Sequence, residues 1–95
     1  MKRLLPLFFL AACGAQPTPV MFGAERVEVT RDGRQYVIFT KENAVEIIRL
    51  GYATRGEHAA IRAQMLALIP EVTGCTLIDT SATGDSGEIR ARIRC

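Results

Sequence analysis

The stretch CTLIDTSATGDSGEIRARIRC, residues 75–95, decides how this chain folds. Its Gly84-Asp85-Ser86 segment has the composition of a β-turn and separates two strand-like runs. A hairpin centred on Asp85 sets Cys75 directly opposite Cys95. Directly opposed residues on antiparallel strands lie about 4.5–5.5 Å apart, which is within disulfide reach. The turn therefore predicts both a strand register and a cysteine pair.

The same register divides the hairpin into two faces. One face is mostly apolar and holds the two cysteines with the pairs Leu77–Ile93, Asp79–Ala91 and Ser81–Ile89. The other face places Thr76, Ile78 and Thr80 opposite Arg94, Arg92 and Arg90. The stripe formed by Arg90, Arg92 and Arg94 has two interpretations. It either contacts an anionic ligand, or it is a solvated outer face whose aliphatic stems cover the residues beneath them.

The first part of the folded region predicts another hairpin. Apolar residues alternate with charged and polar ones on both sides of Asp32-Gly33, which is the strongest two-residue turn signal for a hairpin. Pairing about that turn sets Val29 opposite Tyr36 and Val27 opposite Ile38. These pairs make one coherent apolar face.

Residues 44–50 form a further apolar run. Val45, Ile47 and Ile48 are β-branched, which favours a third strand. The alternative for this segment is a helix that starts at Thr40.

One helix is predicted in the second half of the chain. Thr54-Arg55-Gly56-Glu57 matches a capping box, in which the threonine oxygen accepts an early helical N–H and the glutamate reaches back. The helix is expected to run to about Ile69, because Pro70 follows it. Its buried stripe is expected at Ile61, Met65 and Leu68.

The order β-β-β-α-β-β predicts a small two-layer α+β domain over residues 25–95. In this domain one helix covers an antiparallel sheet, and the C-terminal hairpin carries the cysteine pair. A single helix leaves one sheet face uncovered. That face is expected to show Val37, Phe39, Ile48 and Leu50. Either the C-terminal hairpin packs against it, or it is a partner-binding surface.

The N-terminus has the organisation of a secretory signal. Lys2 and Arg3 precede Leu4–Ala12, an apolar run that is too short to span a bilayer as a helix. Residues 1–12 are therefore expected to be removed. They carry the whole excess of the 12 basic over the 10 acidic residues, so the remaining chain is formally neutral. A neutral chain argues against general nucleic-acid binding.

The apolar run ends in Leu10-Ala11-Ala12-Cys13, which resembles the lipobox of bacterial lipoproteins. In that family the cysteine thiol receives a diacylglyceryl group, the signal is cut before it, and the new amino group is often acylated. The resemblance implies that Cys13 is the lipid attachment site. Residues 14–24 have neither a strand nor a helix period and contain Pro17 and Pro19, so we expect residues 13–24 to be the lipidated cysteine and a flexible tether. The protein would then face the periplasm, with Gly14 favouring the outer over the inner membrane. The alternative is an ordinary cleaved signal followed by a chance cysteine.

Export also bears on the other two cysteines. An oxidising compartment favours disulfides, so we predict a bridge between Cys75 and Cys95. Closing that loop would stabilise a small domain by about 3 kcal/mol. The alternative is two free thiols whose register agrees by chance.

Motifs that would carry chemistry are few. Gly84-Asp85-Ser86-Gly87 resembles the nucleophile segment of chymotrypsin-like serine proteases, but the chain is too short for their two barrels, and the same residues suit a β-turn. His58, the only histidine, is either a general base or a partly exposed residue at the helix edge. With two cysteines assigned to a disulfide and a single histidine, the sequence offers no adequate set of metal ligands. The carboxylates Glu42, Glu46, Glu57 and Glu71 belong to different elements and are not expected to pair.

These observations predict a non-catalytic envelope lipoprotein that binds or helps to assemble another envelope protein. Its membrane contact would be the lipid on Cys13, and neither a cofactor nor a nucleic acid is expected. The alternative function is the capture of an anionic envelope ligand, such as a lipid phosphate or a cell-wall fragment, by Arg90, Arg92 and Arg94. An enzyme with His58 as its base is the third hypothesis.

Overall fold

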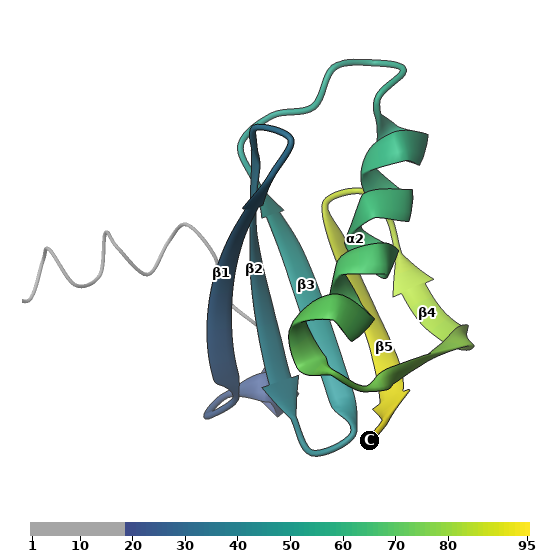
Figure 1. Cartoon of the computed structure of the whole chain (residues 1–95). Coiled ribbons are helices and arrows are strands. Elements are labelled where there is room, and N and C mark those ends of the chain that lie inside the picture. The colour runs from purple at the N-terminus through teal and green to yellow at the C-terminus, as the bar shows by residue number, and fades with distance from the viewer. Residues whose placement is uncertain (1–18) are drawn as a thin grey trace, which may run out of the picture.

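The computed structural model describes residues 19–95 of the chain (Figure 1). Its elements are the 3₁₀ helix η1 (Pro19–Met21), the strands β1 (Glu25–Arg31), β2 (Arg34–Lys41) and β3 (Ala44–Leu50), the helix α2 (His58–Thr73), and the strands β4 (Thr76–Gly84) and β5 (Glu88–Arg94). The five strands form one antiparallel sheet in the order β1-β2-β3-β5-β4. The predicted α+β class and the predicted order of elements are confirmed.

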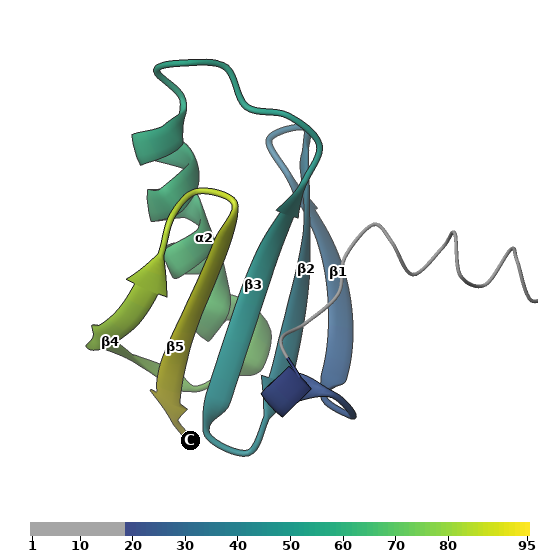
Figure 2. The same cartoon turned by 180° about the vertical axis from the view of Figure 1, so that it is seen from behind.

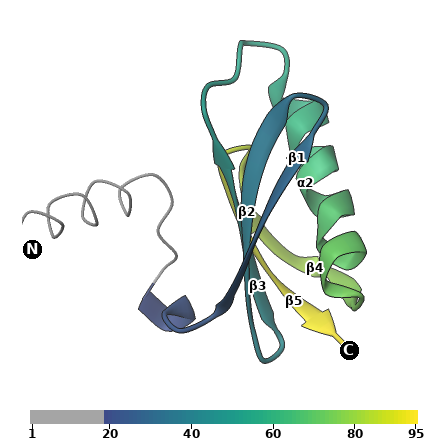
Figure 3. The same ribbon diagram turned by 60° about the vertical axis from the view of Figure 1, so that its left-hand side comes forward.

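The domain has two main layers, because α2 packs along one face of the sheet (Figure 3). The expected helical stripe of Ile61, Met65 and Leu68 is fully buried there. It meets apolar side chains of the three central strands, which are Tyr36, Ile38, Val45, Ile47, Ile89, Ala91 and Ile93. Burial of apolar area in this layer is the main source of the domain's stability.

The first hairpin has the predicted register, with Val29 opposite Tyr36 and Val27 opposite Ile38. Asp32 and Gly33 occupy the turn with φ of 55° and 79°. Positive φ at both central residues is what a type I′ hairpin turn requires. The strand predicted over residues 44–50 is also confirmed, which excludes the helical alternative for that segment.

The helix starts later than its capping box predicted. Half of the box forms, since the backbone N–H of Thr54 donates to Glu57 Oε1 at 3.3 Å. The other half does not, because Glu57 itself is the N-cap and no side chain caps the helix. Gly56 has a φ of 97°, which is not helical, so α2 can begin only at His58.

The predicted end at Pro70 is also wrong, because α2 continues through Pro70 to Thr73. Proline removes one backbone donor, but the chain makes only one more turn beyond it. That last turn is completed by a hydrogen bond from Thr73 Oγ1 to the carbonyl of Ile69 at 2.7 Å. Gly74 then ends the helix in the left-handed conformation and donates to the carbonyl of Pro70.

The register of the C-terminal hairpin is correct near the cysteines and wrong near the turn. The pairs Thr76–Arg94, Leu77–Ile93 and Ile78–Arg92 form as predicted. Beyond Ile78 the register shifts, and Thr83 pairs with Arg90 and Gly84 with Ile89. The predicted pairs Asp79–Ala91, Ser81–Ile89 and Thr80–Arg90 are therefore corrected.

A bulge in β4 explains this shift. The Ser81 hydroxyl donates to the carbonyl of Ile78 at 2.6 Å and accepts the backbone N–H of Arg92 at 2.8 Å. These side-chain bonds take the place of backbone bonds between β4 and β5. Residues 79–82 of β4 can therefore bulge out between the two paired stretches. Closer to the chain end, the predicted disulfide is present, with Cys75 and Cys95 joined across a Cα–Cα distance of 4.4 Å.

The C-terminal hairpin does not pack against the second face of the sheet, as one alternative expected. It extends the sheet instead, because Ile89 and Ala91 of β5 pair with Ile47 and Val45 of β3 and share their helix-facing side. The element on the second face is η1 (Figures 2 and 3). Its Met21 is buried in that face, so packing of the chain begins within the segment expected to be tether.

Candidate functional site

A cleft of about 470 Å³ opens between the start of α2 and the turn that joins β4 to β5. Arg49, His58, Ala59, Arg62 and the turn residues 84–87 line it. The sheet order brings these parts together, because β5 lies directly beside β3 and the β4–β5 turn comes to the end at which β3 finishes (Figure 1). A backbone hydrogen bond from Arg49 to the carbonyl of Gly87, 2.9 Å long, fixes this junction.

Ser86 lies at the centre of the polar contacts. It is 7 % exposed, and its Oγ lies 2.5 Å from Nδ1 of His58. The guanidinium of Arg49 donates from Nη1 to the Ser86 carbonyl at 2.8 Å and to Oγ at 3.3 Å. The structure therefore joins a serine, a histidine and an arginine from three separate elements.

Asp85 has a structural role in the turn. Its Oδ1 accepts the backbone N–H groups of Gly87 at 2.8 Å and Glu88 at 3.3 Å. These two bonds hold the pKa of the Asp85 carboxyl below its usual range. The sequence 84–87 is thus used as a turn, as its composition predicted.

This arrangement differs from a catalytic triad. A triad needs an acid that orients the histidine, which in turn activates the serine. Within residues 19–95, no carboxylate forms a hydrogen bond to the His58 ring. The geometry provides a polar pair with a nearby guanidinium, which is a set of hydrogen-bonding groups for an anion.

The cleft is cationic because its arginines lack ion-pair partners. Neither Arg49 nor Arg62 forms an ion pair with another described residue, although the charge of Arg49 is close enough to help lower the pKa of the Asp85 carboxyl. Arg62 makes one long hydrogen bond, from Nε to the carbonyl of Gly84 at 3.4 Å. The cleft therefore holds two guanidinium groups and one carboxylate, that of Asp85.

The predicted arginine stripe lies elsewhere. Arg90, Arg92 and Arg94 are exposed on alternate positions of β5, on the sheet face opposite to α2. Across the sheet Arg90 is opposite Glu46, which is fully buried, and Arg92 is opposite Ala44. The stripe is a strand surface and does not line the cleft.

The predicted partner residues lie on this same second face. Val37 and Phe39 of β2 are buried in a cluster with Met21. Ile48 and Leu50 of β3 pack against the cluster and remain partly exposed. The apolar residues and the arginines, which are far apart in the sequence, therefore share one surface in the fold.

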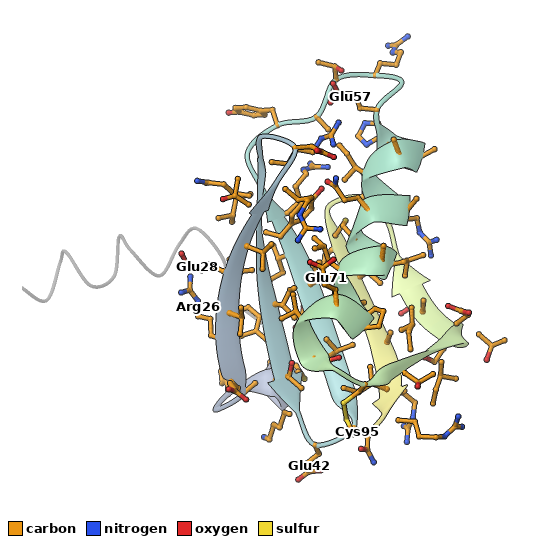
Figure 4. All side chains as sticks on the ribbon, in the orientation of Figure 1. Arg26, Glu28, Glu42, Glu57, Glu71 and Cys95 are labelled. Carbon is orange, nitrogen blue, oxygen red and sulfur yellow. A yellow bond between two sulfur atoms is a disulfide. The ribbon has the colours of Figure 1, made fainter. Side chains whose placement is uncertain are left out.

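The remaining candidates do not form a site. Glu42, Glu57 and Glu71 lie far apart on the molecule (Figure 4). In residues 19–95 no group of three or more histidine, cysteine or acidic side chains could hold a metal ion, and no helix there is long and apolar enough to cross a membrane. The predicted lipidation site Cys13 lies outside the described residues.

The contact between His58 and Ser86 is the feature that sequence reasoning missed. Each residue was noted alone, but they are 28 positions apart, and only the sheet order places them together. No known protein family model matches the sequence, and no significant match is found among curated proteins or solved structures.

Proposed function

We propose that this protein is a lipid-anchored envelope protein, held at the membrane through Cys13, and that its domain is a non-catalytic binding module for another envelope protein. The disulfide between Cys75 and Cys95 supports export, because such bonds persist in oxidising compartments. The sequence Leu10-Ala11-Ala12-Cys13 supports the anchor. One acyl chain holds a protein at the membrane only marginally, whereas two or three chains on the same cysteine give stable attachment.

The observation that carries the binding role is the composition of the second sheet face. Partly exposed Ile48 and Leu50 lie on the same face as the exposed arginines of β5. Protein interfaces combine an apolar centre with a polar rim, and arginine is enriched in them. The partner that fits this face presents apolar side chains bordered by carboxylates.

The anchor would keep this face near the membrane. Five residues lie between Cys13 and Pro19, where η1 begins, and six residue-to-residue steps span at most about 21 Å. η1 packs on the second face through Met21. A membrane-embedded or membrane-proximal partner is therefore within reach.

Site-specific photo-crosslinking in intact cells tests the proposal. A benzoylphenylalanine at position 48 reports on the second face, and one at the exposed position Ala63 of α2 is the matched control. We expect a discrete heavier adduct from position 48, weakened by Arg92→Glu, and none from position 63. The proposal fails if position 48 gives no adduct, or if both positions give the same adducts.

A second candidate function is the capture of an anionic envelope ligand by Arg90, Arg92 and Arg94. It is favoured by the position of η1, which is on the same face as these arginines and close in sequence to the anchor. Replacing Arg90 and Arg92 with glutamate should then abolish binding to cell-wall fragments or anionic lipid. Equal binding by the double variant would eliminate this function, and Arg55→Glu in an exposed loop is the control.

A further inference from the structure

We propose that the cleft between α2 and the β4–β5 turn is a binding site for the phosphate group of a small phosphate ester. The inference goes beyond the proposed function and does not depend on it. The cleft is built on the helix side of the sheet. Arg49 of β3 lies opposite Tyr36 of β2, whose side chain is buried in the core beneath α2. The proposed partner surface is on the opposite side.

Hydrogen-bond donors enter the cleft from three elements. β3 supplies the guanidinium of Arg49 and α2 supplies that of Arg62. The His58 ring and the Ser86 hydroxyl share one hydrogen bond, so this pair, which joins α2 to the turn, supplies one further donor. A tetrahedral phosphate has acceptor oxygens in several directions, whereas a carboxylate has two oxygens in one plane. Donors on several sides therefore favour phosphate, for which arginine is the preferred ligand.

The charge balance of the cleft favours an anion. Arg49 and Arg62 form no ion pair with any described residue. Asp85 is the one acidic residue in the lining, and its Oδ1 is held by the backbone N–H groups of Gly87 and Glu88. Two guanidinium groups against one carboxylate leave a net positive lining.

The start of α2 adds to the positive potential. The first intrahelical bond runs from Ile61 N–H to the carbonyl of Glu57, so the N–H groups of residues 58–60 have no acceptor within the helix. No side chain caps this 16-residue helix, and Ala59 lines the cleft. Uncapped N–H groups and the helix dipole both attract phosphate. The arginines and the cleft itself are the independent reason for placing a ligand here.

The size of the cleft leaves room for an organic group attached to the phosphate. Its volume of about 470 Å³ is in the range that holds a small organic molecule. A phosphate bound at the arginines leaves space for an attached polyol or sugar. Two sources share this chemistry, a soluble phosphate ester and the headgroup of a phospholipid.

The test uses the full-length protein in detergent micelles, titrated with glycerol 1-phosphate and followed by backbone amide NMR and calorimetry. Glycerol is the uncharged control ligand. We expect saturable shifts of the amides of residues 58–62 and 84–87, and none with glycerol. Arg62→Gln should weaken binding about tenfold or more, because a charge-assisted contact is lost. Arg92→Gln, which changes an arginine outside the cleft, should stay within about twofold.

A second variant tests the same site, and a lipid membrane distinguishes the two possible sources of the phosphate. His58→Gln should also weaken binding, and an unchanged thermal midpoint shows that the variants remain folded. In nanodiscs that contain phosphatidic acid, a lower apparent affinity for glycerol 1-phosphate assigns the site to a lipid headgroup, and an unchanged affinity assigns it to a soluble ester. Equal binding by Arg62→Gln and the wild type, an equal loss in Arg92→Gln, or no saturable binding would overturn the proposal.

Discussion

Removing the Cys75–Cys95 bridge should cost this domain much of its stability. The two cysteines are 20 positions apart in the sequence. In the chain-entropy model, closing a loop of that length destabilises the unfolded state by about 3 kcal/mol. Small domains have a total stability of about 5–15 kcal/mol, so the loss is a large fraction of the whole.

The folded state should survive the change with little local damage. Leu77 and Ile93 still pair, and the backbone N–H of Ile93 still donates to the carbonyl of Asn43 at 2.9 Å. Cys95 is exposed, and Cys75 is only partly buried against the helix-side core, so replacing both with alanine removes little buried surface. The effect should therefore come mainly from the unfolded chain, whose conformational freedom increases.

Urea unfolding followed by circular dichroism measures this effect. The variant Cys75→Ala/Cys95→Ala should unfold at lower urea, with a thermal midpoint lower by about 10–25 °C. Reductant should lower the wild-type midpoint by a similar amount and leave the variant unchanged. A variant within about 0.5 kcal/mol of the wild type, or a wild type insensitive to reductant, would refute the loop-closure reasoning.

Four substitutions test other parts of the fold. Met65→Ala empties a fully buried position under the sheet and should cost about 2–5 kcal/mol in urea unfolding. Gly74→Ala places a side chain at a φ of 73° with free space around it and should cost about 1 kcal/mol, whereas Gly84→Ala should cost more, because its Cβ would lie 2.1 Å from the carbonyl oxygen of Glu88; equal costs would contradict this ranking. Asp85 has a lowered pKa in the folded state, so its carboxylate stabilises the domain above the unfolded pKa of about 3.9, and this contribution disappears as the pH falls through the lower folded pKa. Asp85→Asn should therefore flatten the loss of thermal stability between about pH 5 and pH 2, and an unchanged pH profile would count against the assignment.

Local turn chemistry made much of the fold predictable. Asp32-Gly33 tolerates two positive φ values, and the alternation on either side of it continues without interruption, so one register satisfies both. The cysteine pair gave a similar restraint at the end of the second hairpin. Between them, residues 79–83 are small and mostly polar, and such a run does not indicate which residue leaves the ladder. The bulge at Ser81 was therefore not predictable.

The helix ends show a competition between local signals. The capping box at residues 54–57 contains Gly56, a poor helix former, and this glycine could have moved the predicted start toward His58. At the other end Gly74 was the stronger stop signal, since a helix can continue for one turn past a proline such as Pro70.

The candidate sites depend on contacts that no local pattern reports. β5 pairs with β3 although α2 and β4 separate them in sequence, and this pairing creates both the cationic cleft and the mixed apolar and basic face. Residue types gave the components: a Gly-Asp-Ser-Gly turn, one histidine and several arginines. Their assembly required the sheet order.

The anchor at Cys13 is the central claim, and the intact mass of the protein extracted from membranes tests it most directly. Mass spectrometry of the extracted chain and its N-terminal peptide should show a mature protein that begins at Cys13 and carries a diacylglyceryl group, with or without a third acyl chain on the amino group. A chain that begins at another residue, or an unmodified Cys13, would contradict the claim.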